Sequence, residues 1–295
     1  MRAAFIGAAI FVALQSQPVL AWGSHAHRYI MGRAIDALPA AIKPFFEHFR
    51  TELVVRSIDP DTWRTAGWAD DSSHFLDFGA PEYGPRPFVV LPREYGAAIE
   101  KFGMATLKKY GVLPWREAEE FGNLRRAMEG FNRSVPFAPG NTILFAAVMS
   151  HYIQDAHMPL HASNNHDGQL TGQNGVHGRF ESELFERYQS QLTIAPRPPS
   201  AVSSARDKAF DVLLESFKLV QPLLDADREA IAGKDIYDDE YYRKFFEKAR
   251  PILERRIGES ITATASLIVS AWEAAGKPAL KVSVQTPPQK VRTPR

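Results

Sequence analysis

The stretch LERRIGESITATASLIVSAWEAAG (residues 253–276) decides the fold class. Its large apolar residues recur at intervals of three or four residues, or at sums of these: Leu253, Ile257, Ile261, Ile268 and Trp272. This spacing places them on one face of an α-helix, and Gly276 follows as a typical C-terminal stop. The stretch therefore predicts a long helix with one face buried in a core.

Similar helical patterns cover most of the chain, whereas alternating strand patterns are scarce. We expect helices at about 24–38, 93–110, 115–132, 142–157, 177–191, 203–232 and 236–275, the last with a break at Pro251. Proline and glycine mark 79–93 and 193–204 as loops. The prediction is a single all-α domain over residues 22–276, followed by a disordered, proline-containing basic tail over 277–295.

The composition narrows the possible functions. The chain has 295 residues, and its 45% apolar content is ample for a buried core. The lack of cysteine excludes disulfides, thiolate zinc fingers, iron–sulfur clusters and cysteine nucleophiles. The 35 basic residues nearly balance the 34 acidic ones, but five of the basic residues lie in the tail, which has no acid. The predicted domain is therefore acidic, unlike a protein that grips duplex DNA by its phosphates.

The N-terminus resembles a secretory signal peptide. Arg2 precedes an apolar run over residues 3–14, and Val19-Leu20-Ala21 stand before the expected cleavage point. The apolar run is too short to span a bilayer, which takes about 20 residues. We therefore expect cleavage of residues 1–21 and a secreted or periplasmic protein, of bacterial type, without a transmembrane segment in the mature chain.

Histidine and carboxylate residues gather on the predicted apolar helix faces. All nine histidines precede residue 178, and His151/Asp155 and His177/Glu181 are each four residues apart, on one helical face. A buried carboxylate costs several kcal/mol unless it is paired. A single pair of this kind is commonly a hydrogen-bonded couple in a core, but HYIQDAHMPLH (151–161) adds two further histidines. A cluster of imidazoles and carboxylates without cysteine is typical of catalytic zinc sites.

These residues resemble the zinc-dependent phospholipase C superfamily, which includes the fungal single-strand-specific zinc nucleases. Its members are all-helical and begin, after signal removal, with a tryptophan whose amino group and carbonyl bind a metal. They hold three zinc ions with this tryptophan, five histidines and three carboxylates. The resemblance rests on motifs in chain order: WGSHAH (22–27), DPDTWR (59–64), SSHFLDF (72–78), HYIQDAHMPLH (151–161) and VHGRFE (176–181). The stretch NNHDGQLTGQNGVHGRFES (164–182) also looks like the bacterial phospholipase C members.

The resemblance implies a ligand set for each of the three zinc ions. The first set is Asp61, His74, His151 and Asp155. The second set is His161, His177 and Glu181. The third set is Trp22, His27 and Asp155, so that Asp155 bridges two ions. Asp59 is the alternative to Asp61, because the gap of thirteen residues from Asp61 to His74 is shorter than in the family.

The resemblance also implies an activity. We expect a zinc-dependent phosphodiesterase, most simply a phospholipase C that recognises a phospholipid head group and uses metal-activated water. Glu181 favours this branch, because the nuclease branch carries aspartate there. Asp61 and Glu181 are the candidate proton acceptors. Arg64 is expected to orient Asp61 or contact phosphate, with a surface ion pair as its alternative role.

Two other functions remain open from the sequence. A single-strand-specific nuclease or nucleotidase would use the same metal centre and stack bases on exposed aromatic residues. A non-catalytic binding protein would use zinc only to hold its helices together. Structural zinc sites are usually closed by four protein ligands, whereas the second set here has three.

The role implied for Trp22 gives a first prediction. If its free amine binds zinc, one extra residue before Trp22 should weaken the third zinc ion and depress activity. Zinc content and turnover of the mature protein, measured with and without the extension, test this. Equal values for both proteins would refute the assignment.

Overall fold

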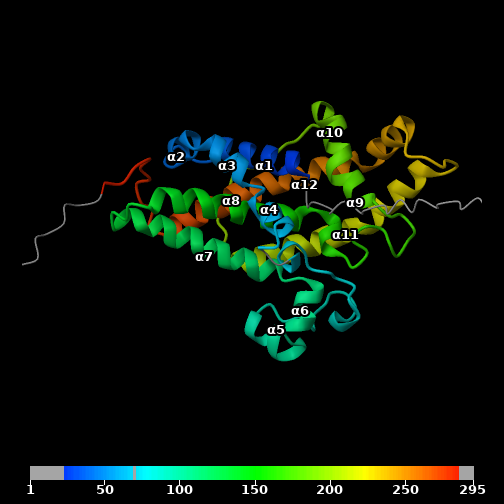
Figure 1. The fold of residues 1–295 in the computed structure, drawn as a ribbon, viewed down its shortest axis with the longest axis horizontal. Coiled ribbons are helices and arrows are strands. Elements are labelled where there is room, and N and C mark those ends of the chain that lie inside the picture. The colour runs from blue at the N-terminus through cyan, green and yellow to red at the C-terminus, as the bar shows by residue number, and fades with distance from the viewer. Residues whose placement is uncertain (1–22, 69–70, 286–295) are drawn as a thin grey trace, which may run out of the picture.

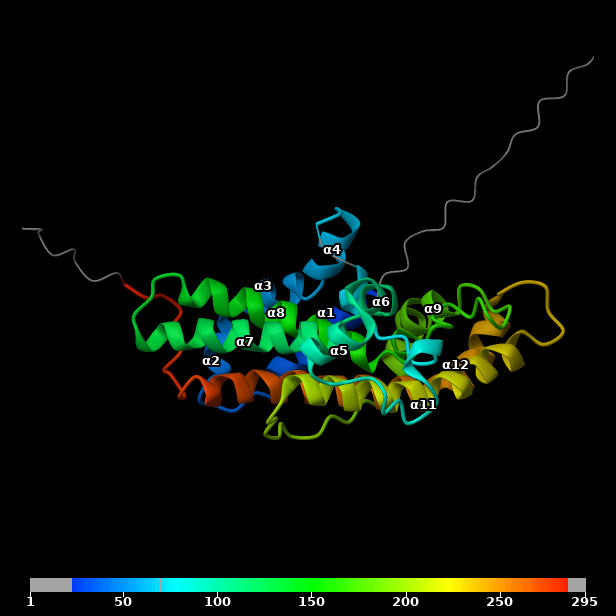
Figure 2. The same cartoon turned by 90° about the horizontal axis from the view of Figure 1, so that it is seen from below.

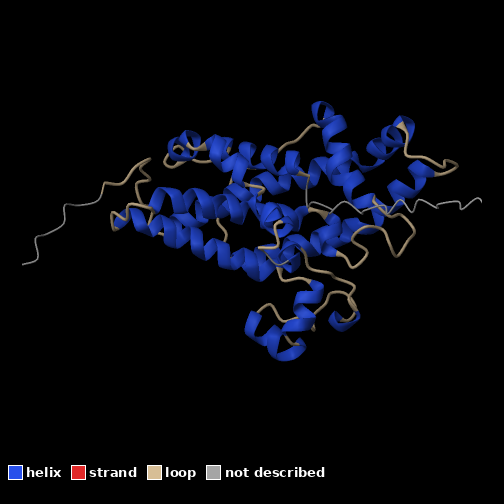
Figure 3. Ribbon diagram, in the orientation of Figure 1, coloured by secondary structure: helices blue, strands red, loops and turns tan. Residues whose placement is uncertain are grey.

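The computed structural model describes residues 23–68 and 71–285, and over these residues the chain is helical without a single strand (Figure 3). One isolated bridge joins Phe78 to Ser163. The predicted all-α class is therefore confirmed. The α-helices are α1 (Ser24–Asp36), α2 (Lys43–His48), α3 (Arg50–Arg56), α4 (Asp59–Thr65), α5 (Tyr95–Phe102), α6 (Met104–Tyr110), α7 (Leu113–Asn132), α8 (Ala138–His157), α9 (Val176–Gly178), α10 (Phe185–Tyr188), α11 (Ala205–Ile231) and α12 (Asp239–Ala274).

Shorter helical turns connect several of these helices. A π-helical turn, η4 (Arg179–Leu184), joins α9 to α10. The 3₁₀ turns are η1 (Asp71–His74), η2 (Pro81–Tyr83), η3 (Pro159–Ala162) and η5 (Gln189–Gln191). The predicted helix at 177–191 is thus a succession of α, π and 3₁₀ turns.

Helix α8 is the centre of the fold. The longer helices α7, α8, α11 and α12 run along the long axis of the molecule, and α5 and α6 project from it (Figures 1 and 2). Helix α8 contacts α1, α3, α7, α11 and α12. Every residue from Ala146 to His157 is buried. Polar side chains in this stretch therefore face other protein groups rather than water.

The expected break at Pro251 is wrong. Helix α12 runs without interruption through Pro251. Proline lacks the N–H that would bond to the carbonyl of Glu247. Both residues are exposed, so that water can hydrate the free carbonyl and the helix continues.

Other differences from the predicted helices have local causes. Helices α2, α3 and α4 were not expected, because six or seven residues are too few to show a periodic pattern. The predicted helix at 93–110 is two helices, α5 and α6. They meet at Gly103, whose positive φ of 76° is incompatible with a continuous helix.

An extended segment over 192–204 lies along α12. It includes the predicted loop over 193–204. The backbone N–H groups of Thr193, Arg197, Ser200 and Val202 donate to side chains of α12 at 2.6 to 3.0 Å. The acceptors are spaced by four or eight residues and therefore share one helical face: Glu254, Thr262, Ser266 and Ser270.

The two chain ends are described only in part. The predicted signal peptide and Trp22 lie outside the described residues. In the tail, Pro278 is buried and its carbonyl accepts a hydrogen bond of 2.9 Å from the Trp272 indole. Across 23–68 and 71–285, no helix combines the length and apolarity needed to cross a membrane.

Glu117 of α7 gives a prediction about stability. It is fully buried, and neither carboxylate oxygen has a hydrogen-bond partner. Burial, with smaller effects from Glu120 and Asp155, raises its pKa well above 4.5. Because the folded pKa is the higher one, the free energy of unfolding should fall as the pH rises above 4.5.

Urea unfolding of Glu117→Gln at pH values from 5 to 8 should show a smaller loss of stability with rising pH than the parent protein. The control is Glu119→Gln, a neighbouring residue with an exposed side chain that pairs with Arg116. An unchanged pH dependence in Glu117→Gln would show that this carboxyl is not the source of the loss.

Candidate metal centre

The C-terminal end of α8 carries the centre of the candidate site. His151 and Asp155 are fully buried on one face of the helix. The helix ends at Met158, whose extended backbone (ψ 117°) precedes the 3₁₀ turn η3. This turn brings His161 back beside His74, where its Nδ1 donates to the His74 carbonyl at 2.7 Å.

The first predicted ligand set converges on one point. His74 Nδ1 and His151 Nε2 lie 3.1 Å apart, and they lie 3.0 and 3.2 Å from Asp155 Oδ2. Asp61 Oδ1 is 3.8 Å from each of the two nitrogens. Asp61 comes from α4 and His74 from η1, so that three separate segments supply these four buried side chains.

The second predicted set forms a second point of convergence. His161 Nε2 lies 3.2 Å from His177 Nε2, which lies 3.0 Å from Glu181 Oε2. His177 is in α9 and Glu181 is in the π-helical turn. Turns of this kind are frequent at functional sites. All three side chains are buried.

Three of these histidines make hydrogen bonds through Nδ1, the ring nitrogen that points away from the two points of convergence. These bonds determine which groups the two points can bind. His151 Nδ1 donates to Ser57 O at 2.9 Å, His161 Nδ1 to His74 O, and His177 Nδ1 to His166 O at 2.8 Å. A neutral imidazole with its proton on Nδ1 has only a lone pair on Nε2. Nε2 atoms and carboxylate oxygens therefore face one another at each point, an arrangement that a proton or a metal ion between them would satisfy.

His27 of α1 forms a third contact with the cluster. Its Nδ1 lies 2.7 Å from Gln154 Oε1 and its Nε2 lies 3.3 Å from Asp155 Oδ1. The other oxygen of Asp155 faces His74 and His151. The two oxygens of one carboxylate thus serve two groups, which is the geometry of a bridging ligand. Trp22, the predicted partner of His27, lies outside the described residues.

The electrostatics of the cluster reflect burial and close opposite charges. Burial lowers the pKa of His151, but Asp155 and Asp61 outweigh it and raise that pKa to about 9. Burial raises the pKa of Glu181 to about 7, against the lowering effect of His177. Burial lowers the pKa of His74. Protons and a metal ion compete for the same atoms, so that metal binding here should release protons.

Unpaired polar atoms also fit a cation. Such buried atoms usually have a hydrogen-bond partner. In the cluster, the atoms without one are His27 Nε2, His74 Nε2, Asp155 Oδ1 and both carboxylate oxygens of Asp61. Three buried groups within 4.8 Å could hold a metal ion in the described part of the chain: His27/His151/Asp155, Asp61/His74/His151 and His161/His177/Glu181.

The structure distinguishes Asp61 from Asp59, the two alternatives for the carboxylate of the first ligand set. Asp59, the alternative ligand, pairs with Arg56 at 3.4 Å and lies outside the three groups. Arg64 lies between Asp61, at 3.6 Å, and Asp71, at 3.5 Å. It therefore orients Asp61 by charge.

The remaining histidines lie outside the three groups. The His25 side chain is exposed and lies 3.7 Å from Glu186, and His48 is exposed. His166 contributes only its backbone carbonyl. His157 is two residues from Asp155 and therefore points about 200° away around α8.

A buried ion pair that the sequence did not reveal supports the second group. Arg179, two residues before Glu181, pairs with Asp227 of α11 at 3.1 Å. Its guanidinium also donates to the carbonyls of Asn174 and Gln173, at 2.8 and 3.2 Å. This pair fixes the loop before α9 to the bundle. No spacing in the sequence links residues 48 positions apart, so only the fold could identify them.

Comparisons with known proteins add no assignment. A scan against protein-family models gives no match. No curated protein matches the chain either.

The Arg179–Asp227 pair leads to a prediction about metal binding. Asp227→Asn should weaken the binding of one metal ion by about ten- to a hundredfold, because supporting contacts set the orientation of metal ligands. Zinc titration of the metal-free protein against a chromophoric chelator measures each binding step. Asp225→Asn, a partly exposed residue that pairs with Arg228 on the same helix, is the control. Equal weakening in both variants would argue against a specific role for Asp227.

Proposed function

We propose that this protein is an exported zinc-dependent phosphodiesterase that acts on phospholipids as a phospholipase C. One observation carries the metal part of the proposal. His161 and His177 turn their Nε2 atoms toward each other, 3.2 Å apart and beside the buried carboxylate of Glu181. One metal ion would satisfy all three groups at once, whereas a single proton would satisfy only one pair of them.

The donor set fits zinc. Imidazole nitrogens and carboxylate oxygens without thiolates are its ligands in catalytic sites, where three protein ligands leave one position open. His161, His177 and Glu181 would hold one ion in this way. Asp61, His74, His151 and Asp155 would hold a second ion, and His27, Asp155 and Trp22 a third. Bound zinc supplies Lewis acidity toward phosphoryl oxygens and brings the pKa of water down to about 7.

The chain's own residues would prepare the reacting groups. Asp61 and Glu181 are the proposed proton acceptors at the two ends of the cluster. Arg64, at 3.6 Å, holds Asp61 by charge and offers a cation to a phosphate group that approaches the site. The hydrogen bonds of His151, His161 and His177 to backbone carbonyls place a proton on Nδ1, so that Nε2 is the nitrogen that would bind an ion.

The choice of phospholipid rests on the sequence resemblance. Glu181 stands where the nuclease branch carries aspartate, and the acidic domain is unsuited to attracting a polyanion. Export rests on the signal-like residues 1–21. A single-strand nuclease would use the same metal centre, so the assay must include nucleic acid.

The test is a parallel assay of the mature protein on phosphatidylcholine, single-stranded DNA and RNA, with and without a chelator. We expect release of the phosphorylated head group, loss of that activity with chelator, and recovery with zinc. His161→Ala should lower turnover by about a hundredfold or more, since it removes one of three ligands of an ion. His48→Ala, an exposed histidine outside the three candidate metal groups, should leave turnover unchanged.

The other outcomes each contradict part of the proposal. Cleavage of DNA or RNA alone would replace phospholipase with nuclease. Activity that persists with chelator would refute the metal mechanism. Bound zinc without activity on any substrate would indicate a structural role for the metal.

A further inference from the structure

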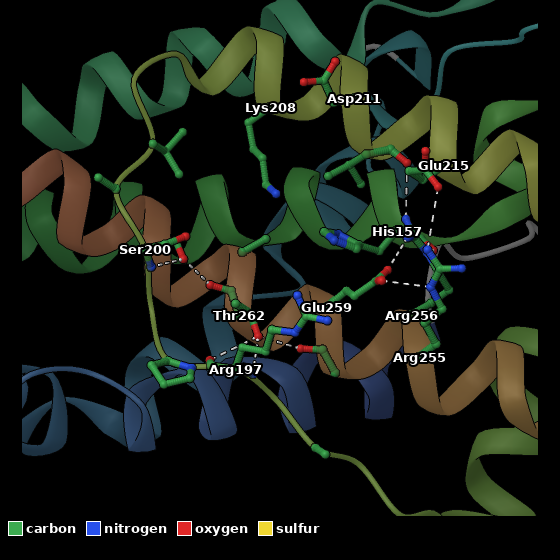
Figure 4. A pocket seen from close by; sticks show the side chains of 18 of the residues that line it. His157, Arg197, Ser200, Lys208, Asp211, Glu215, Arg255, Arg256, Glu259 and Thr262 are labelled. Carbon is green, nitrogen blue, oxygen red and sulfur yellow. Dashed lines mark hydrogen bonds and ion pairs between the residues drawn. The ribbon is translucent and has the colours of Figure 1, made fainter.

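A second cavity lies on the side of α8 away from the metal cluster. It has a volume of about 1000 Å³, is partly open to solvent and lies between the extended segment 193–204, α11 and α12 (Figure 4). His157 of α8 is among its lining residues. This cavity shares no lining residue with the three candidate metal groups.

His157 and Lys208 face this cavity, and each has a side-chain nitrogen without a hydrogen-bond partner in the described chain. His157 is 2% exposed, and its Nδ1 donates to Ile153 O at 2.7 Å. Its Nε2 therefore presents a lone pair, and it has no partner within the described chain. Lys208 of α11 extends into the same cavity, and its Nζ makes no hydrogen bond or ion pair there (Figure 4).

Most of the other charged side chains of the cavity already have partners, although the exposed Arg197 bonds to Thr262 only through its backbone. Arg256 is buried and donates to the His157 carbonyl at 2.9 Å and to Ser216 Oγ at 2.7 Å, and it also pairs with Glu259. Each acidic residue of the lining pairs with an arginine or lysine: Asp207, Asp211, Glu215, Glu254 and Glu259. Lys208 and the exposed Arg197 are therefore the cations of this lining whose side chains make no hydrogen bond or ion pair within the described chain, and Lys208 faces the same cavity as His157 (Figure 4).

We propose that this cavity binds a small oxyanion that carries a hydroxyl group, with a protonated phosphate as the simplest example. An anionic oxygen accepts from Lys208 Nζ, while the P–OH group donates to His157 Nε2. The hydrogen bond from Lys208 is charge-assisted and is therefore the stronger of the two. The hydrogen bond to His157 discriminates between oxyanions with and without a hydroxyl group. The inference does not depend on the proposed function, because α8 separates the cavity from the metal cluster.

The experiment titrates the zinc-loaded protein with inorganic phosphate and, separately, with sulfate. The ring signals of His157 and the Nζ signal of Lys208 are followed by NMR, which separates this site from phosphate bound at the metal cluster. We expect saturable shifts with phosphate. Sulfate has no hydrogen at neutral pH to donate to Nε2, and it should bind several-fold more weakly.

Two charge-matched variants complete the test. Lys208→Met should weaken phosphate binding at His157 by about tenfold or more, since it removes a charged hydrogen bond. Lys244→Met, which removes a partly exposed lysine paired with Glu240 outside the cavity, should leave binding unchanged. Both variants should keep the thermal midpoint of the parent protein.

Three results would overturn the proposal. Absence of a saturable shift at His157 would mean that only water occupies the cavity. Equal phosphate affinity in Lys208→Met and the parent protein would remove the lysine from the site. Equal affinity for sulfate and phosphate would refute the assignment of His157 as the acceptor for a hydroxyl.

Discussion

Carboxylates and imidazoles are buried together at the C-terminal end of α8, and their need for positive charge organises this structure. Asp61, Asp155 and Glu181 are buried carboxylates, and the histidines beside them turn ring nitrogens toward the same points. Removing such groups from water costs several kcal/mol each unless positive charge compensates. Protons compensate in part, as the raised pKa values of His151 and Glu181 show. Metal ions compensate more completely, because one ion satisfies several acceptors at once.

The helical bundle holds this cluster in place, because other groups of the protein bind the ligand side chains on the side that faces away from the cluster. Backbone carbonyls of Ser57, His74 and His166 receive the Nδ1 protons and thereby set the tautomers. The Arg179–Asp227 pair fastens the segment that carries His177 and Glu181. The same helix presents His157 on its opposite side to a separate cavity, where Arg256 holds the carbonyl of that residue. Helix α8 therefore connects two polar sites that the apolar core otherwise separates.

Much of the fold could be predicted from periodicity, and the errors have physical causes. The apolar face of 253–272 predicted α12, since an amphipathic pattern needs only local spacing. The expected break at Pro251 was wrong because hydration of an exposed carbonyl lets the helix continue. Helices α2 to α4 were missed because they are too short for a pattern. At the site, spacing paired His151 with Asp155 and His177 with Glu181. Grouping the pairs with Asp61, His74 and His161 needed the family resemblance, and the structure now brings the same residues together.

Residue type and local spacing alone specify the all-α class, the lack of thiolate chemistry and the pairing of ligands within one helical turn. The packing of distant helices was needed to place Asp61 rather than Asp59 among the histidines, to turn His157 away from them, and to bring Lys208 and His157 to one cavity. These outcomes depend on how distant helices pack. Backbone carbonyls and buried ion pairs such as Arg179–Asp227 leave no local signal, so that tautomers and supporting contacts become visible only in the folded chain.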